Sequence, residues 1–432
     1  MKMNKTTPLS KGLFLNIKTT AETIDILYKH FAPIVQVIES IPILESNNRV
    51  LAQDVYSSED IPNFNRSTMD GYSLNARDTF GASSSMPAYL NIAGDVLMGE
   101  ATSLRLKSGE AARIPTGGML PEDANAVVMI EHTHEIDSKT LEVQKPVGIW
   151  ENTVRIGQDI KKQGRLFSKG KLLRAYEIGA LAAIGQTRVD VYQRLRVGII
   201  STGDEIVPAH ALPKIGQVRD INSLVIGSKL LELGAIPEFY GIVQDKAELI
   251  HDAVLTCVEQ NDVVLICGGS SVGTRDFVVD TLSSIGEVLV HGVAMRPGKP
   301  TIIAQIKDKP VIGLPGHPAS TTIAFLVLVQ PLLAHLQNTT LSQWHLTATT
   351  SRNIPSQPGR EDYVRVKIKS IQANAEYMIH DTGFSSDTKY LAEPIFGPSG
   401  LIHPIFEANG LIKIPIDCEG LNKGEETRVM LI

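Results

Sequence analysis

The chain has 432 residues, of which 43% are hydrophobic and 20% charged, enough for roughly two to four domains with buried cores. Its net charge of −6 excludes a general electrostatic attraction to nucleic acid or to an anionic membrane. Cys257, Cys267 and Cys418 are widely spaced, which argues against a disulfide framework or a zinc site and fits a reducing compartment.

The N-terminal half predicts one helix, a β-rich segment and a second helix. The N-terminus lacks the apolar stretch of a signal peptide, so we expect a cytoplasmic protein. Thr19 and Glu22 match a capping box ahead of apolar residues at near-helical spacing, which predicts a helix. Short apolar runs and turn glycines between residues 51 and 150 indicate strands. Residues 174–185 are typical of a helix that ends at a glycine.

From residue 195 onward, predicted strands alternate with predicted helices. Strands are expected at 197–200, 236–243, 262–267, 301–306 and 310–314, and helices at 222–233, 246–260, 276–285 and 319–336. This alternation predicts a three-layer αβα domain with a mostly parallel sheet. The last helix is too polar to span a bilayer and is expected to be buried. Residues 339–432 return to a β-rich pattern, with strands at 363–368, 411–415 and 429–432, which favours a small barrel or sandwich.

Four loops of the αβ segment carry residues suited to an anion or a metal, at strand ends where such sheets bind ligands. Residues 201–205 offer hydroxyls, a glycine and two carboxylates, although an ordinary polar turn explains them equally well. Residues 268–276 hold three glycines ahead of a helix, which favours a cradle of N–H groups, although the Gly-Lys-Ser/Thr of a Walker A loop is absent.

The other two loops add positive charge. Arg296 and Lys299 flank a rigid Pro-Gly turn, and residues 313–320 lead into the closing helix, whose N-terminus favours anions. Each loop alone also fits a purely structural turn, and a lone histidine such as His317 is more often a loop residue than a ligand. Asp245, after another strand, could form a magnesium site with Glu205 and Asp276 or could simply cap a helix.

These loops resemble the molybdopterin molybdenumtransferase (MoeA) family, whose relatives include the E domains of plant and animal molybdenum-cofactor proteins such as gephyrin. The shared motifs in the αβ segment are STGDE (201–205), GGSSVGTRD (268–276), RPGKP (296–300) and GLPGHPAS (313–320). Similar motifs outside it are STMDGY (67–72), IPTGG (114–118), AVVMIE (126–131), GQDI (157–160), Gly359-Arg360 and ANGL (408–411). The resemblance therefore covers nearly the whole chain.

The resemblance implies a multidomain α/β fold and a transferase activity. Its domains would be a helical linking domain (1–50 and 151–190), a β-rich second domain (51–150), a molybdopterin-binding αβα domain (191–338) and a C-terminal β-barrel-like domain (339–432). The implied protein is a homodimer with its active site between the αβ domain of one subunit and the second domain of the other. It would insert molybdate into adenylylated molybdopterin, release AMP and use Mg²⁺. Molybdenum-cofactor pathway proteins are possible partners.

Matching positions assign roles to particular residues. The implied catalytic residues are Asp70, Thr116, Asp159, Glu205, Asp245 and Asp276, of which Glu205, Asp245 and Asp276 would hold the metal. The implied substrate-binding residues are Ser201, Thr202, Gly203, Asp220, Asn222, Gly268, Gly269, Ser271, Gly273, Arg296, Gly298, Lys299, Pro315, Gly316, His317, Pro318, Ser320 and Arg360.

The sequence departs from the usual family pattern at Val154, Gly292, His317 and His403. Normal, reduced or redirected activity all stay open. Two alternatives also stay open: the related adenylyltransferase, which is typically a single small domain, and a molybdopterin-binding scaffold without catalysis.

Overall fold

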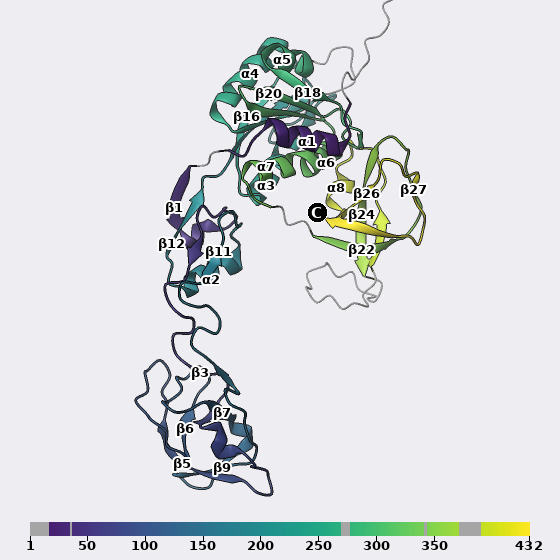
Figure 1. The fold of residues 1–432 in the computed structure, drawn as a ribbon. Coiled ribbons are helices and arrows are strands. Elements are labelled where there is room, and N and C mark those ends of the chain that lie inside the picture. The colour runs from purple at the N-terminus through teal and green to yellow at the C-terminus, as the bar shows by residue number, and fades with distance from the viewer. Residues whose placement is uncertain (1–16, 35–36, 269–276, 341–343, 371–389) are drawn as a thin grey trace, which may run out of the picture. The chain divides into compact units, whose positions relative to one another are not determined.

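The computed structural model describes residues 17–34, 37–268, 277–340, 344–370 and 390–432. The chain forms two compact units (Figure 1). The main unit comprises residues 1–39, 47–50 and 191–432, and the second unit comprises residues 40–46 and 51–190. The chain passes between them along β1 (Ile38–Pro42) and β12 (Arg188–Tyr192).

A six-stranded sheet forms the centre of the αβ part of the main unit, in the order β16-β13-β17-β21-β20-β18. These strands are β13 (Arg196–Thr202), β16 (Ile236–Val243), β17 (Val263–Cys267), β18 (Glu287–His291), β20 (Ile302–Ile306) and β21 (Lys309–Leu314). The first four strands in this order are mutually parallel, which confirms the predicted mostly parallel sheet. β20 runs antiparallel to both of its neighbours. Lys307 and Asp308, both with positive φ, form the tight turn that joins β20 to β21.

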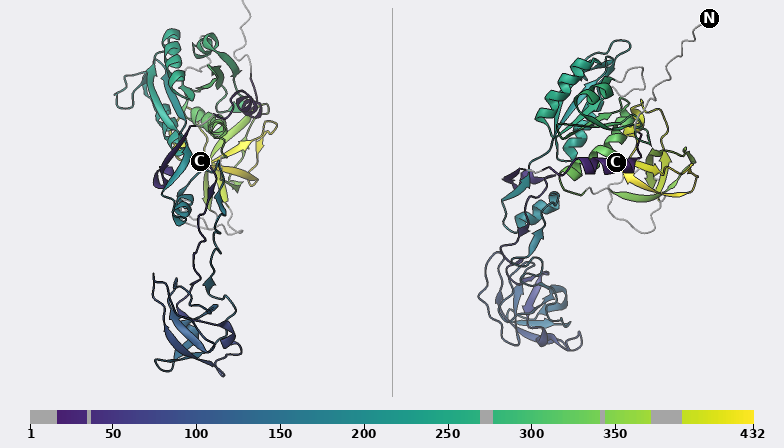
Figure 2. Two further views of the ribbon diagram at one scale, coloured as in Figure 1. Left: turned by 60° about the vertical axis from the view of Figure 1, so that its left-hand side comes forward. Right: turned by 45° about the horizontal axis from the view of Figure 1, so that its top comes forward.

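Helices cover both faces of this sheet, as Figures 1 and 2 show. They are α1 (Thr20–His30), α3 (Asn222–Glu232), α4 (Ala247–Gln260), α5 (Phe277–Ile285), α6 (Pro318–Ala324) and α7 (Gln330–Leu336). Alternate residues of β13 face opposite layers: Ile199 packs with α1, α3, α6 and α7, whereas Ile200 packs with α4 and α5. The predicted capping box of Thr19 and Glu22 is confirmed at the start of α1.

The closing helix was predicted as one continuous α-helix, but a π-helical turn, Phe325–Val329, separates α6 from α7. Pro331 lacks an N–H group and its ring crowds the preceding turn, so the local hydrogen-bond pattern widens there. The N–H of Gln330 donates to the carbonyl of Phe325, five residues back. Among the described residues, one helix, Pro318–Leu336, has the length and hydropathy of a membrane span, yet 72% of it is buried inside the protein. It is therefore a core helix, as expected.

The C-terminal part of the main unit is a small closed barrel. Its strands are β22 (His345–Thr350), β24 (Glu361–Ser370), β25 (Tyr390–Pro394), β26 (Gly410–Ile414) and β28 (Glu426–Leu431). The order β24-β25-β22-β28-β26 closes because β26 also pairs with β24. The predicted barrel is thus confirmed. A short strand from the αβ part, β19 (Met295–Arg296), adds to β24 in parallel.

Smaller elements complete the main unit. They are the strand pairs β14 (Ile206–Val207) with β15 (Val218–Arg219) and β23 (Ile354–Pro355) with β27 (Gly420–Leu421), and the one-turn helix α8 (His403–Phe406).

The second unit is built on a mixed sheet in the order β7-β4-β6-β5-β9-β8. These strands are β4 (Gly71–Leu74), β5 (Ala88–Asp95), β6 (Glu110–Ile114), β7 (Ala126–Met129), β8 (Thr133–Glu135) and β9 (Thr140–Val143). The unit also contains α2 (Ala175–Ala183) and the strand pairs β2 (Val55–Tyr56) with β11 (Arg165–Phe167) and β3 (Arg66–Ser67) with β10 (Thr153–Val154). The predicted β-rich segment is confirmed.

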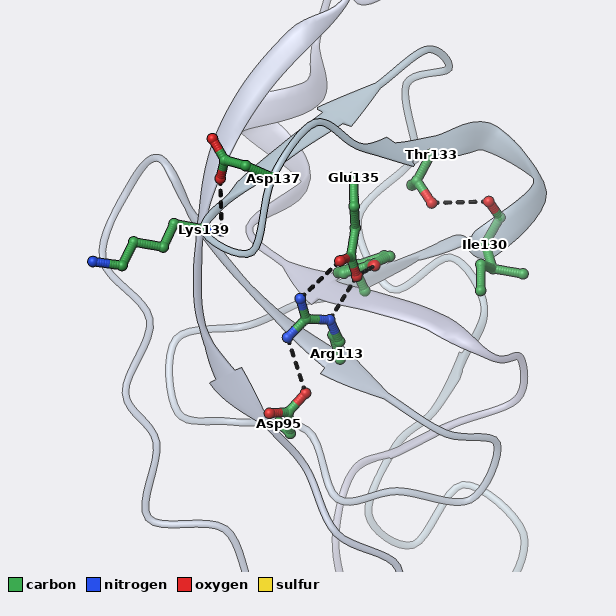
Figure 3. A network of polar contacts seen from close by, with 8 residues as sticks. Asp95, Arg113, Ile130, Thr133, Glu135, Asp137 and Lys139 are labelled. Atoms are coloured by element: carbon green, nitrogen blue, oxygen red, sulfur yellow. Dashed lines mark hydrogen bonds and ion pairs between the residues drawn. The ribbon is translucent and has the colours of Figure 1, made fainter.

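An ion-pair network crosses this sheet (Figure 3). Arg113 contacts both carboxylate oxygens of Glu135, at 2.6 and 2.9 Å, and Asp95 at 3.2 Å. The bidentate contact with Arg113 lowers the pKa of Glu135 to about 2, so this carboxylate stays ionised over the whole physiological range.

Candidate functional site

A cavity of about 1670 Å³ opens in the main unit, between the carboxyl ends of the parallel strands and the start of the barrel. All four predicted loops contribute to its lining, because β13, β17 and β21 end at the same edge of the sheet. The predicted residues that line it are Ser201, Thr202, Glu205, Asp220, Asn222, Gly268, Arg296, Gly298, Lys299, Pro315, Gly316, His317, Pro318, Ser320 and Arg360. Gly203 and Asp245 do not line it. Gly269, Ser271, Gly273 and Asp276 lie outside the described residues.

The ends of β13 and β17 meet closely at the floor of the cavity. A Cβ atom on Gly268 would lie 2.3 Å from the carbonyl oxygen of Thr202, and Gly268 has φ +114°, so a side chain does not fit there. The Oγ1 atom of Thr202 is buried and has no hydrogen-bond partner among the described residues. A buried hydroxyl without a partner is costly, and a bound ligand can supply the missing hydrogen bond.

Asp220 and Asn222 hold the neighbouring loops in place. The Asp220 carboxylate accepts hydrogen bonds from the Ser201 hydroxyl at 2.6 Å and from the hydroxyl and N–H of Ser223, at 2.7 and 3.2 Å, at the start of α3. The Asn222 side chain donates to the carbonyl oxygen of Gly316 at 2.7 Å. Both side chains therefore order the loops that a ligand would contact.

His317 and Ser399 join the αβ part to the barrel across one rim of the cavity. The Nδ1 atom of His317 lies 2.9 Å from the Ser399 hydroxyl, and the N–H of Ala319 donates to the Ser399 carbonyl at 3.1 Å. Both residues line the cavity, so this rim is formed by two segments distant in sequence.

Positive charge gathers on the barrel side of the cavity. Arg296 and Arg360 contact the two different oxygens of the buried Asp362 carboxylate, at 3.8 and 3.1 Å. Arg365, also buried, donates to the carbonyl of Gly397 at 3.1 Å, and its Nη1 atom has no partner among the described residues. Lys299 also lines the cavity, and this set of cations suits an oxyanion.

Asp245 lies among carboxylates beside the β13 loop. Its Oδ1 atom is buried without a partner in the described part of the chain, and its N–H donates to Asp204 at 3.3 Å. Burial and the neighbouring Asp204 and Glu205 raise the pKa of Asp245. Among the described residues, no group of three or more His, Cys, Asp or Glu side chains is arranged to hold a metal ion. The metal assignment, which includes Asp276, stays a prediction.

The remaining predicted residues belong to the second unit. Asp70 accepts hydrogen bonds from the N–H and hydroxyl of Thr116, at 2.7 and 3.0 Å, and the first of these lowers the pKa of Asp70 most. Asp159 is exposed, and its backbone N–H donates to the carbonyl oxygen of Ile61 at 3.1 Å. The structure thus brings Asp70 and Thr116 together as an ionised carboxylate beside a hydroxyl.

Sequence reasoning missed several residues of the cavity: Cys267, Asp362, Tyr363, Arg365, Phe396 and Ser399. Cys267 ends β17, and burial raises the pKa of its thiol far above the usual range, so it remains protonated. Asp362 and Arg365 lie at buried positions of β24, and no pattern in the sequence marked either of them.

Family models match three consecutive parts of the chain. Residues 18–185 match the MoeA N-terminal region (domain I and II), residues 198–335 a probable molybdopterin binding domain, and residues 347–432 the MoeA C-terminal region (domain IV).

Two relatives illustrate the similarity in sequence. A putative molybdopterin biosynthesis protein of Methanocaldococcus jannaschii is 37% identical over 404 residues, which cover 91% of this chain and 92% of that protein. The molybdopterin molybdenumtransferase of Haemophilus influenzae is 33% identical over 334 residues, covering 76% and 80%.

The fold is similar to a solved molybdopterin biosynthesis MoeA protein from Pyrococcus horikoshii. That structure has a TM-score of 0.72 and 34% identity, over 96% of this chain and 99% of the other. Because both sequence and fold match from the first described helix to the last strand, this chain belongs to the MoeA family.

Proposed function

We propose that this protein is a molybdopterin molybdenumtransferase that acts in molybdenum cofactor biosynthesis, in the cytoplasm. Its substrates would be adenylylated molybdopterin and molybdate, and AMP would be released. The observation that carries the proposal is that four loops from separate strand ends line one cavity, whose lining includes Arg296, Lys299, Arg360 and Arg365. Curated relatives bear the name of this transferase.

The residue types suit the proposed chemistry. Molybdate is a tetrahedral dianion, and guanidinium groups pair well with oxyanions through several parallel N–H donors. The Thr202 hydroxyl at the floor would bind a polar group of the pterin or its phosphate. Cleavage of a phosphoanhydride depends mainly on positioning and on neutralisation of charge. The proposed sulfur ligands of molybdenum are those of the molybdopterin substrate.

Magnesium is part of the proposal, with Asp245, Glu205 and Asp276 as its ligands. The fit rests on Asp245, whose buried Oδ1 lacks a partner among the described residues and whose pKa is raised by burial and by nearby carboxylates. A bound cation would give the Oδ1 atom a partner and would favour the ionised form of the carboxyl group. When bound, Mg²⁺ would neutralise developing charge on the phosphates.

The proposed assembly is a homodimer, in which Asp70, Thr116 and Asp159 of one subunit would serve the cavity of the other. The hydrogen bonds from Thr116 keep Asp70 ionised, which suits a role opposite a cationic or metal-bound group. Docking of other proteins of the molybdenum-cofactor pathway also stays a proposal.

AMP release is the direct test. The full chain is mixed with adenylylated molybdopterin and Mg²⁺, and AMP is measured before and after addition of molybdate. We expect release that requires both molybdate and Mg²⁺, and its loss in Asp276→Ala. A protein that binds molybdopterin tightly but never releases AMP would instead be the scaffold considered above.

Arg296→Ala tests the anion site. We expect it to weaken molybdate use more than molybdopterin binding, since the guanidinium lies on the cationic side of the cavity. Arg196→Ala is the matched control, because Arg196 starts β13 at the opposite end of the sheet and pairs with Glu238. Equal weakening of both substrates by Arg296→Ala would contradict the assigned role.

A further inference from the structure

We propose that Asp362 is a positioning residue that holds Arg296 and Arg360 as a pre-arranged pair for the oxyanion. This inference rests on the proposed function for the identity of the anion. Asp362 belongs to none of the motifs discussed above. It lines the cavity, yet the residue is only 4% exposed, so its carboxylate has little access to water.

The contacts of this carboxylate divide between the two arginines. Its Oδ1 atom lies 3.1 Å from Nε of Arg360, and its Oδ2 atom lies 3.8 Å from Nη1 of Arg296. The side chains of Arg360 and Arg296 remain 31% and 62% exposed. One edge of each guanidinium is therefore turned towards Asp362, and since a guanidinium carries five N–H donors, other donors stay available to a ligand.

Strand pairing explains why these residues meet. β19 and β24 are parallel neighbours, and Arg296 is the register partner of Asp362. Arg360 directly precedes β24. Arg296 thus comes from the αβ part and Arg360 from the barrel, and the carboxylate lies between the two segments. Without it, two like charges at one wall would repel, and each flexible side chain would sample many rotamers before binding.

Asp362 also has an opposing effect on the anion. Its negative charge repels an oxyanion, so its removal strengthens attraction while it loosens the two arginines. The Asp362 carboxylate is buried, so its contact with Arg360 is less screened by solvent than a contact between two exposed side chains, whereas Arg296 is more exposed and its contact is screened more. We expect the positioning effect to outweigh the repulsion, and this ordering is what the experiment tests.

Glu361 provides a matched control on the same strand. Its buried carboxylate points away from the cavity and is bonded by Thr20, by Tyr363 at 2.8 Å and by Lys413 at 2.8 Å. Glu361→Gln and Asp362→Asn make the same chemical change at adjacent buried positions. Loss of folded stability alone would therefore affect both variants, whereas loss of anion positioning would affect only Asp362→Asn.

The experiment is calorimetric titration of the full chain with molybdate, in wild type, Asp362→Asn and Glu361→Gln. We expect Asp362→Asn to raise the Kd for molybdate about tenfold, with Glu361→Gln within twofold of wild type. Unchanged or tighter binding by Asp362→Asn would overturn the proposal. This readout needs no turnover, so a wild-type protein that binds molybdate but releases no AMP would count against the proposed function and leave the role of Asp362 intact.

A second measurement distinguishes loss of anion positioning from a folding defect in Asp362→Asn. In a background of Arg296→Gln and Arg360→Gln, Asp362→Asn should cause no further weakening of molybdate binding, because the side chains that it positions are gone. A further tenfold loss in that background would show that Asp362 acts through the fold, and would also overturn the proposal. If Asp362→Asn does not fold, Asp362→Glu replaces it, with a smaller rise in Kd expected from the displaced carboxylate.

Discussion

Asp245 destabilises the folded chain when it is ionised. Burial and the charges of Asp204 and Glu205 raise its pKa above the usual 3.8. Since folding raises this pKa, the penalty is absent at low pH and appears as pH rises through the folded value. Asp245→Asn should therefore unfold at a slightly higher temperature than wild type at about pH 7.5, and at an equal temperature near pH 3. Thermal denaturation at the two pH values checks this.

The same variant should lose function while it gains stability. If Asp245 holds magnesium, Asp245→Asn requires more Mg²⁺ for AMP release, and activity of the wild type falls at acid pH as the carboxyl group takes up a proton. A normal Mg²⁺ requirement in Asp245→Asn would show that Asp245 is not a magnesium ligand. Asp204→Asn is a useful comparison, because it removes a neighbouring charge and leaves Asp245 in place.

At the residue scale, the sequence predicted the cavity residues of the loops better than those of the barrel strand β24. Glycines, hydroxyls and cations clustered after strands were visible in the sequence, and the loops at Ser201 and Gly316 indeed line one cavity. Asp362 and Arg365 were missed because they lie inside a strand, where charge usually faces solvent. Their burial follows from closure of the barrel against the αβ part, which no local pattern reveals.

At the element scale, α1 is joined to β24 through one buried carboxylate. Burial opposes ionisation of Glu361, but hydrogen bonds from Lys413, Thr20 and Tyr363 outweigh it, so its pKa is lowered below 4.5. The resulting stabilisation is present above that value and is lost as pH falls through the folded pKa. Glu361→Gln should lower the free energy of unfolding by about 1–3 kcal/mol at neutral pH and by less under acid conditions.

Urea denaturation at about pH 7 and pH 4 measures this difference. Lys413→Met serves as a control that removes the cation but leaves both hydroxyl donors, and it should cost less than Glu361→Gln. Equal stability of Glu361→Gln and wild type at neutral pH would show that the link between α1 and the barrel contributes nothing to folding.

Elements with a clear apolar pattern were predictable, and strands with very short apolar runs were not. β17 is uniformly apolar and β13 has an apolar centre, and both were found within a few residues. β18 and β25 were missed, because each holds a run of only three apolar residues next to charged or polar ones, which is too short to indicate a strand. The π-helical turn at Phe325 was also missed, since sequence periodicity hardly distinguishes it from an α-helix.

At the scale of the whole molecule, the proposed homodimer makes a complementation prediction. At limiting molybdate, Asp70→Asn and Arg296→Gln should each leave little activity alone, because each would damage both sites of its dimer. Co-expressed at equal levels, they should recover about a quarter of wild-type activity, since half of randomly mixed dimers are hybrids with one intact site. AMP release from the co-purified mixture measures this. Recovery near zero would place Asp70 and Arg296 in the same subunit's site or exclude a dimer.

The pairing of β19 with β24 restricts how the cavity can open. Arg296 and Asp362 lie on hydrogen-bonded neighbouring strands, so any tilt of the barrel would move both residues together. If a large substrate enters by opening the cavity, the movement would have to occur elsewhere. In the described part of the chain, one side-chain and one backbone hydrogen bond join His317 and Ala319 to Ser399 at the rim. The side of the cavity that carries Arg296 and Arg360 would stay in place, and the segment around Ser399 would move.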